Sequence, residues 1–332
     1  PIAEAFAVSV TTATASFTYL TSGVFVGTLL AVFVFDYFRL KSVVLGGAVL
    51  ILLAIFSIYS VPSFTVFSVS LAVIGVCCGI ELSAAAVVIS KLFEARLRAS
   101  MLLLTDSFYS IAGVVSTSVA GMLLASGLGW PSAYAVAFSA TAAVLVIAAT
   151  ARYPDTKSAT AAASPAADVS AWPASVHIIG LAMLIYLVGF VSLYSWVPNY
   201  AQEFLGADVE YSGTIVSRFF LGMFIGQLIM FFMVFRVSLR LLMIVCLLFA
   251  ASLTTALWLV GTATQQATAM LCLGLATGGV FKIVLTYGTL QVDDPSPRMV
   301  SYLIFYAGLG TSIAPFVSAA VVDGFGMTAA LQ

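Results

Sequence analysis

Charged side chains are scarce in this sequence. Asp, Glu, Lys and Arg make up 8% of its 332 residues, whereas soluble domains carry about 25%. The net charge is −1, and Lys and Arg are too few and too scattered for the clustered basic surface that nucleic-acid phosphates require. The composition therefore excludes an ordinary water-soluble domain and predicts no nucleic-acid partner.

Residue types that commonly build catalytic and metal sites are equally sparse. The chain has one histidine and four cysteines, and the cysteines lie in apolar segments without the spacing of a zinc site. It also has no glycine-rich phosphate-binding loop. We therefore predict that the protein is not an enzyme, that it has no metal site and that it uses no cofactor.

Apolar residues dominate what remains. They make up 62% of the chain, and polar residues divide the sequence into ten apolar runs. A helix of about 20 apolar residues crosses the hydrocarbon core of a bilayer, so each run predicts one membrane span. The predicted spans are residues 12–35, 42–60, 65–90, 101–124, 132–151, 177–200, 212–235, 241–260, 267–290 and 301–322. The sequence thus predicts an all-α membrane protein in contact with lipid.

The basic residues predict its orientation. Ten of the twelve Lys and Arg fall in every second loop between spans, and basic loops are retained on the cytoplasmic side. The other two, Arg218 and Lys282, lie within predicted spans. We therefore expect these loops to face the cytoplasm and both ends of the chain to face outward.

A polar segment divides the chain into two halves. Residues 152–175 are rich in Ala, Ser and Pro and too polar to cross a membrane. We predict an N-terminal helical bundle at 1–151, a cytoplasmic linker at 152–175 and a C-terminal helical bundle at 176–332.

The two halves repeat one another at an offset of 199 or 197 residues. Such internal symmetry is typical of secondary transporters built from two related bundles. Small residues spaced four apart also let membrane helices approach closely. The matched pairs are Gly23 with Gly222, Gly27 with Gly226, Gly75 with Gly274, Gly79 with Gly278, Phe108 with Phe305, and Tyr109 with Tyr306.

Glu81 and Lys282 are the two charged side chains deep inside long apolar runs. Each costs about 2.5–3.5 kcal/mol at that depth, so such groups usually face a cavity and serve transport. A carboxyl group in a poorly hydrated cavity can take up a proton on one side and release it on the other. Glu81 is our candidate for proton coupling, and the alternative is an acid held permanently in an ion pair or in hydrogen bonds between helices. Lys282 is its candidate partner; binding of a substrate anion and snorkelling are the alternatives.

Other polar and aromatic residues are weaker candidates. Arg218 either contacts substrate or anchors its helix near the outer surface. Asp106 suggests a gate or a structural role through bonds to Arg39 or Arg98. An aromatic and amide cluster at the outer end of its span suits a sugar-like ligand or an ordinary membrane interface. This cluster is Tyr194, Trp196 and Asn199, and the repeat-related Tyr109 and Tyr306 are expected to line a cavity symmetrically.

The loop at residues 36–41 resembles the signature loop between the second and third helices of the major facilitator superfamily. Asp36 and Lys41 match its acidic and basic positions, while Arg39 replaces its usual glycine. The resemblance implies two six-helix bundles with gate residues at Asp36, Arg39 and Lys41. It also implies that the ten spans are family helices two to eleven, so that this chain lacks the first and last helices.

Four further strings resemble the TsgA-type branch of that superfamily, near the fucose-type proton symporters. They are LTDSF at 104–108, SWVP at 195–198, GTIVS at 213–217 and PSPR at 295–298. In the fucose-type branch a glutamate of the fourth helix takes part in proton coupling. The string CGIEL at 78–82 resembles its surroundings, which implies that role for Glu81.

These observations predict a secondary transporter of the bacterial inner membrane. We expect alternating access, a small polar and sugar-like solute, and proton symport. The alternatives are an efflux or uniport carrier of the same fold, or a truncated membrane protein that senses rather than transports.

Overall fold

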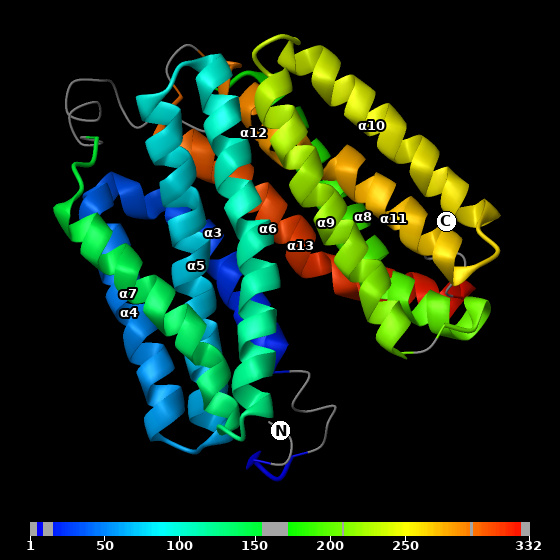
Figure 1. The fold of residues 1–332 in the computed structure, drawn as a ribbon. Coiled ribbons are helices and arrows are strands. Elements are labelled where there is room, and N and C mark those ends of the chain that lie inside the picture. The colour runs from blue at the N-terminus through cyan, green and yellow to red at the C-terminus, as the bar shows by residue number, and fades with distance from the viewer. Residues whose placement is uncertain (1–4, 9–15, 155–171, 208, 293–294, 327–332) are drawn as a thin grey trace. The chain divides into compact units, whose positions relative to one another are not determined.

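A computed structural model describes residues 5–8, 16–154, 172–207, 209–292 and 295–326 (Figure 1). Regular structure within these ranges is helical. The first half contains α3 (Phe17–Tyr37), α4 (Leu40–Ser60), α5 (Phe64–Leu92), α6 (Ala95–Ala125), the short 3-10 helix η1 (Trp130–Tyr134) and α7 (Ala135–Thr150). The second half contains α8 (Ala174–Leu205), α9 (Val209–Met233), α10 (Leu239–Ala256), η3 (Leu257–Leu259), α11 (Ala263–Thr277), α12 (Val280–Thr289) and α13 (Pro297–Phe325).

The predicted fold class is confirmed. Among the described residues, nine helical segments are long and apolar enough to cross a membrane. The span at 263–289 joins α11 and α12 and is 27 residues long. The 31-residue α6 coincides with the remaining predicted span. Each predicted span therefore corresponds to a helix, and the first one begins in residues outside the described ranges.

Local sequence explains where several helices begin and end. The hydroxyls of Ser238 and Thr262 accept hydrogen bonds from backbone N–H groups in the first turns of α10 and α11, at 3.4 and 3.3 Å. These caps satisfy donors that a helix start leaves free. Gly206 ends α8 with a φ of +65°, a conformation that glycine adopts without strain.

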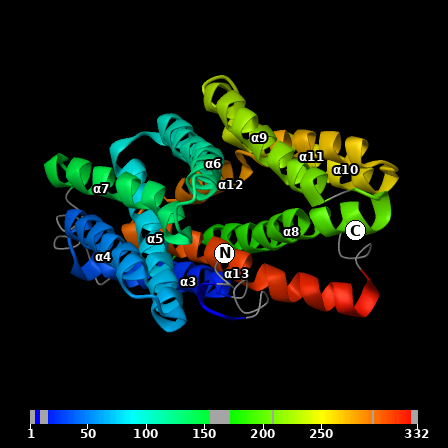
Figure 2. The same ribbon diagram turned by 60° about the horizontal axis from the view of Figure 1, so that its bottom comes forward.

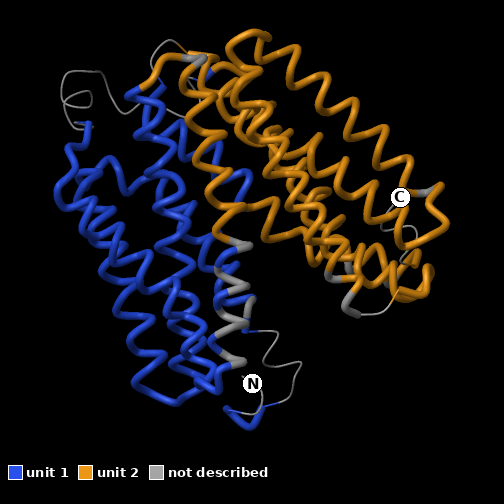
Figure 3. The backbone as a smooth tube through the Cα atoms, viewed as in Figure 1, with its two compact units in different colours: residues 1–92, 113–172, 294–308 blue, residues 93–112, 173–293, 309–332 orange. Residues whose placement is uncertain are grey.

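The described chain divides into two compact units (Figure 3). Unit 1 comprises residues 1–92, 113–172 and 294–308, and unit 2 comprises residues 93–112, 173–293 and 309–332. Most of each predicted bundle falls in one unit. The first part of α6 belongs to unit 2, and the first part of α13 belongs to unit 1. The division at residues 151 and 176 stays a prediction, and most of the predicted linker lies outside the described residues.

Each unit contains one pair of helices that pack especially closely. In unit 1, α3 packs along α5, and in unit 2, α9 packs along α11 (Figure 2). A methyl group added at Gly27 would collide with the carbonyl oxygen of Val76, and one added at Gly226 would collide with that of Leu275. Val76 and Leu275 are themselves 199 residues apart. The repeat found in the sequence is therefore a repeat of backbone contacts.

The remaining glycine pairs follow the same rule. Gly75 approaches the carbonyl oxygen of Leu20, and Gly274 approaches that of Phe219, again at the offset of 199 residues. Small residues allow this approach in a bilayer, where packing rather than water exclusion holds helices together. The two pseudo-symmetric bundles of the predicted fold class rest on these contacts.

Candidate functional site

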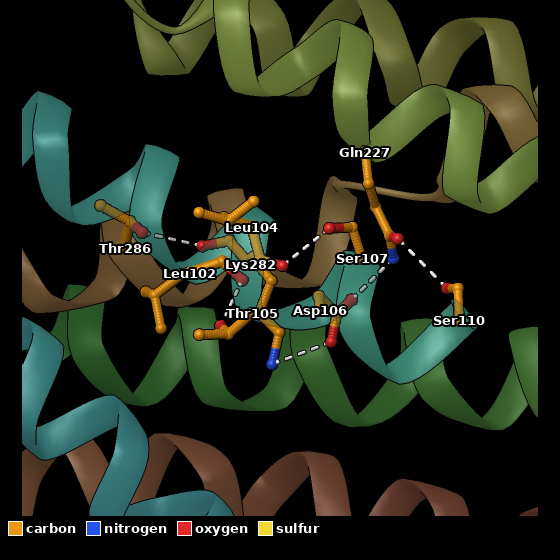
Figure 4. A network of polar contacts seen from close by, with 9 residues as sticks. All are labelled: Leu102, Leu104, Thr105, Asp106, Ser107, Ser110, Gln227, Lys282 and Thr286. Carbon is orange, nitrogen blue, oxygen red and sulfur yellow. Dashed lines mark hydrogen bonds and ion pairs between the residues drawn. The ribbon is translucent and has the colours of Figure 1, made fainter. Parts of the chain in front are cut away.

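A network of buried polar side chains lies in unit 2, where α6, α9 and α12 meet (Figure 4). Its centre is an ion pair: Lys282 Nζ lies 3.1 Å from Asp106 Oδ1. The side chains of Lys282 and Asp106 are 6% and 19% exposed. Both charged side chains are thus largely buried between helices and away from lipid.

The network continues from Asp106 to α9. Gln227 Nε2 donates a hydrogen bond of 3.0 Å to Asp106 Oδ2, and Ser110 Oγ donates one of 3.1 Å to Gln227 Oε1. Both carboxylate oxygens of Asp106 therefore have a partner. Gln227 is fully buried, so its amide fixes the orientation of the carboxylate relative to Lys282.

The ion pair makes the centre of unit 2 electrically neutral. A buried charge that loses its partner is strongly destabilising, whereas a paired one is tolerated. The ammonium group of Lys282 also lies 4.6 Å from the centre of the Phe281 ring, a distance at which the ring face attracts a cation. Lys282 has three donor hydrogens, so hydrogen-bonding capacity remains beyond its bond to Asp106.

A break in the span at 263–289 sets the position of Lys282. Helix α11 ends at Thr277, α12 begins at Val280, and Gly278 and Gly279 join them. A methyl group added at Gly279 would collide with Met230 of α9 and come within 2.7 Å of Leu103 Cδ2 of α6. Gly279 therefore lets α12 begin close to both α6 and α9, and Lys282 lies in the first turn of α12 opposite Asp106.

Glu81 lies in unit 1, on α5, and has different surroundings. A methyl group added at Gly47 of α4 would be 2.6 Å from Glu81 Oε1. This oxygen is buried, and within the described ranges it has no hydrogen-bond partner. The two ionic groups singled out in the sequence thus differ: Lys282 is paired, and the Glu81 oxygen is not.

The partners of Lys282 and Asp106 differ from those suggested by the sequence. Lys282 pairs with Asp106, where the sequence suggested Glu81. Asp106 bonds to Lys282 and Gln227, where the sequence suggested Arg39 or Arg98. Arg98 instead donates a hydrogen bond of 2.9 Å to Thr289. The physical reason is helix packing, because α6 and α12 bring Asp106 and Lys282 together although 176 positions separate them in the chain.

Sequence reasoning missed Gln227 and Ser110. The available signal was a single amide in the apolar run around Gly226, a residue type that seldom lies in hydrocarbon without a partner. Attention to charged residues alone overlooked it.

The aromatic candidates are spread over both units. Tyr194 packs in unit 2 against the rings of Phe190 and Phe220, with centroids 5.6 and 5.8 Å away. On the same helix Trp196 is half-buried and Asn199 is exposed. Tyr109 is 71% exposed in unit 2. Tyr306 belongs to unit 1, where its hydroxyl lies 3.0 Å from that of Tyr302.

The gate candidates lie at the ends of helices. Lys41 Nζ donates to the carbonyl oxygens of Ala149 and Ala151, at 2.7 and 3.0 Å, so it caps the end of α7. Asp36 and Arg39 are exposed, and Arg218 is half-buried in α9. The gate roles, the symmetric lining and the contact of Arg218 with substrate remain predictions. Within the described ranges no three His, Cys, Asp or Glu side chains are grouped closely enough for a metal ion.

Proteins related by sequence share nearly the whole chain. Protein TsgA homologs of Serratia proteamaculans and Erwinia tasmaniensis are 31% and 30% identical to it. Protein TsgA of Shigella flexneri is 28% identical over 330 residues. Each of these alignments covers 99% of this chain and 84% of the relative.

Solved structures with this fold include transporters. FucP, a major facilitator superfamily transporter in the outward conformation, aligns with a TM-score of 0.85 at 16% identity, over 99% of this chain and 88% of FucP. The proton:xylose symporter XylE bound to 6-bromo-6-deoxy-D-glucose aligns with a TM-score of 0.77 at 14% identity, over 98% of this chain and 84% of XylE.

The sequence model of the Major Facilitator Superfamily matches residues 1–315. Together with the membrane-spanning helices and the repeated backbone contacts, this match identifies the chain as a multi-pass membrane protein that belongs to the major facilitator superfamily.

Proposed function

We propose that this protein is a proton-coupled secondary transporter that moves a small, neutral, sugar-like solute by alternating access. Family membership supports the transporter class. Two proteins with this fold are a fucose:proton symporter and a proton:xylose symporter, which supports coupling to protons and a sugar-like solute. The basic loops predicted at alternate positions support an inner-membrane protein whose linker faces the cytoplasm.

The observation that carries proton coupling is the buried Glu81 oxygen without a hydrogen-bond partner among the described residues. A carboxylate in that position is poorly solvated and gains from taking up a proton, while release requires contact with water. Alternating access provides such contact on each side in turn. Glu81 is the proton carrier in this proposal.

The Asp106–Lys282 pair has the complementary role of binding solute. It is neutral as a whole, so it favours a solute that itself carries no net charge. Lys282 keeps donor capacity for a hydroxyl or carbonyl oxygen, and Gln227 holds the carboxylate of Asp106 in place. Because Lys282 already has an anionic partner, Glu81 is free to change its protonation state.

Transport by the purified chain in lipid vesicles tests the proposal. Labelled fucose and labelled xylose serve as probes, with the outside more acidic than the inside. We expect the protein to accumulate at least one sugar above its equilibrium level, and Glu81→Gln to abolish accumulation while retaining part of the exchange of labelled for unlabelled sugar. Unchanged accumulation by Glu81→Gln would reject Glu81 as the carrier. Equilibration without accumulation would indicate uniport, and a lack of transport of both sugars would refute the sugar assignment.

A further inference from the structure

The backbone of α4 runs unusually close to the Glu81 side chain. The three atoms nearest to a methyl group added at Gly47 would all belong to Glu81, with Oε1 at 2.6 Å and Cδ at 3.4 Å. Carbon and oxygen atoms do not normally approach to 2.6 Å without a bond between them. A side chain at position 47 would therefore push the flexible Glu81 carboxyl group out of its present position.

The neighbouring glycine provides a contrast. Gly46 lies on the same helix, and a methyl group added there would meet nothing within 4 Å. Both glycines have the same low intrinsic helix propensity. The absence of a side chain therefore has a local steric consequence at Gly47 and none at Gly46.

The second half of the chain shows what replaces this arrangement where no carboxyl group is present. At the offset of 199 residues, Gly47 corresponds to Cys246 and Glu81 corresponds to Val280. Cys246 and Val280 are both buried in one apolar cluster of unit 2. Position 246 on α10 thus carries a side chain, and its counterpart across the cluster is the apolar Val280. Position 47 on α4 carries none, and its counterpart is Glu81.

We propose that Gly47 is a positioning residue for Glu81: by leaving room on α4, it holds the carboxyl group in a pocket where Oε1 is buried without a protein hydrogen-bond partner and can exchange a proton. This inference rests on the proposed proton-coupled function. Gly47 is not one of the repeated glycines and lies outside the signature loop at residues 36–41, so this role is separate from both.

Few other ionisable groups affect this carboxyl group. Cys77 and Cys78 on α5 interact with it electrostatically. Beyond α7, burial raises the pKa of Tyr153, and the charge on Glu81 raises it further. Among the described residues of α3 and α4, none contributes a resolved charge interaction to Glu81. A change in its pH response after substitution of Gly47 therefore reports on local geometry.

A stability cycle tests the geometry without any substrate. The variants are Gly47→Ala, Glu81→Ala and the double variant, with Gly46→Ala as the matched control, each purified as the full chain. We expect Gly47→Ala to lower the apparent Tm by about 3 °C. In the Glu81→Ala background the same change should lower it by less than about 1 °C, because the obstructing carboxyl group is gone. An equal decrease in both backgrounds would overturn the inference.

The pH dependence of sugar accumulation tests the consequence for coupling. Relative to Gly46→Ala, we expect Gly47→Ala to shift the midpoint of the pH profile by about one pH unit, which corresponds to a tenfold change in proton affinity. Exchange of labelled for unlabelled sugar should remain. If the profile of Gly47→Ala matches that of Gly46→Ala while Glu81→Gln abolishes accumulation, the role of Gly47 is refuted and the proposed function stands. If Glu81→Gln has no effect, the proposed function itself fails. Should Gly47→Ala be too unstable to purify, the double variant Gly47→Ala with Glu81→Ala decides: purification as for Glu81→Ala would identify the carboxyl group as the obstacle, and failure of the double variant as well would refute the role.

Discussion

The two halves of this protein share a scaffold and differ in their buried polar groups. In both halves, glycines bring two helices into contact at equivalent carbonyl oxygens. Unit 2 contains an ion pair whose charges cancel, with an amide that fixes one partner. Unit 1 contains a carboxyl group whose buried oxygen has no hydrogen-bond partner among the described residues. The same helical framework thus holds a paired ionic site in one half and, among the described residues, a carboxyl oxygen without a partner in the other.

This difference suggests a division of labour between the halves. An ion pair without net charge suits recognition of a neutral solute. A poorly solvated carboxyl group favours its protonated form and releases the proton when water reaches it, which suits proton transfer.

The largest effect is expected from Lys282→Ala. Asp106 would remain partly buried without its cation, and loss of one member of a buried pair costs about 3–5 kcal/mol. Denaturant-induced unfolding in mild detergent should show this loss for Lys282→Ala. The double variant Asp106→Asn with Lys282→Ala should recover at least half of it, because no isolated charge remains. A Lys282→Ala protein as stable as the wild type would contradict the buried pair.

The shared framework is tested by paired substitutions at equivalent glycines. Gly27→Ala and Gly226→Ala each force a methyl group against a backbone carbonyl, which cannot move aside as a side chain can. We expect each to cost about 3 kcal/mol, at the upper end for overpacking, as measured by unfolding in detergent. Gly46→Ala, which meets open space, is the control. A large cost in one half only would break the equivalence of the two scaffolds.

Gln227→Leu tests the amide that completes the network in unit 2. A hydrogen bond to a charged group contributes about 1.5–3 kcal/mol, so we expect a loss of about 2 kcal/mol in stability. Sugar binding, followed by thermal shift, should weaken at the same time because the carboxylate of Asp106 is no longer held. Gln227→Glu is a control that keeps the length of the side chain but places a second acid beside Asp106, so it should be more harmful than Gln227→Leu.

The smallest effect concerns the equivalent basic residues Lys41 and Arg240. Lys41 binds two carbonyl oxygens at the end of α7, whereas Arg240 is exposed. We expect Lys41→Met to cost about 1 kcal/mol, as for an ordinary hydrogen-bonded cap, and Arg240→Met to change unfolding within about 0.5 kcal/mol. Equal values for the two variants would show that the contact of Lys41 contributes nothing specific.

The sequence was sufficient to predict most of the fold. Length and hydropathy located the spans because a bilayer requires helices of a certain length. The offset of 199 residues predicted equivalent glycine contacts, and the structure contains them. The break between α11 and α12 was not predicted, because Gly278 and Gly279 lie in an apolar run that reads as one continuous helix.

The candidate site was predictable only in part. Lys282 stood out because a charge is rare at its depth, but its partner depends on how α6 packs against α12, and hydropathy contains no information on helix rotation. Gln227 and Ser110 drew no attention because neutral polar residues are common in spans. The space at Gly47 depends on the distance between two backbones, which residue type alone does not predict.

The close approach of glycines to carbonyl oxygens also restricts which parts of each half can move. Helices α3 and α5 interlock at successive turns, and sliding by one residue would drive side chains into the backbone of the neighbour. The α3–α5 pair is therefore expected to move as one rigid body, and so is the α9–α11 pair. Relative movement of helices within a unit is therefore expected outside these two pairs, because the glycines of α11, up to Gly278 at its end, already lie against the backbone of α9.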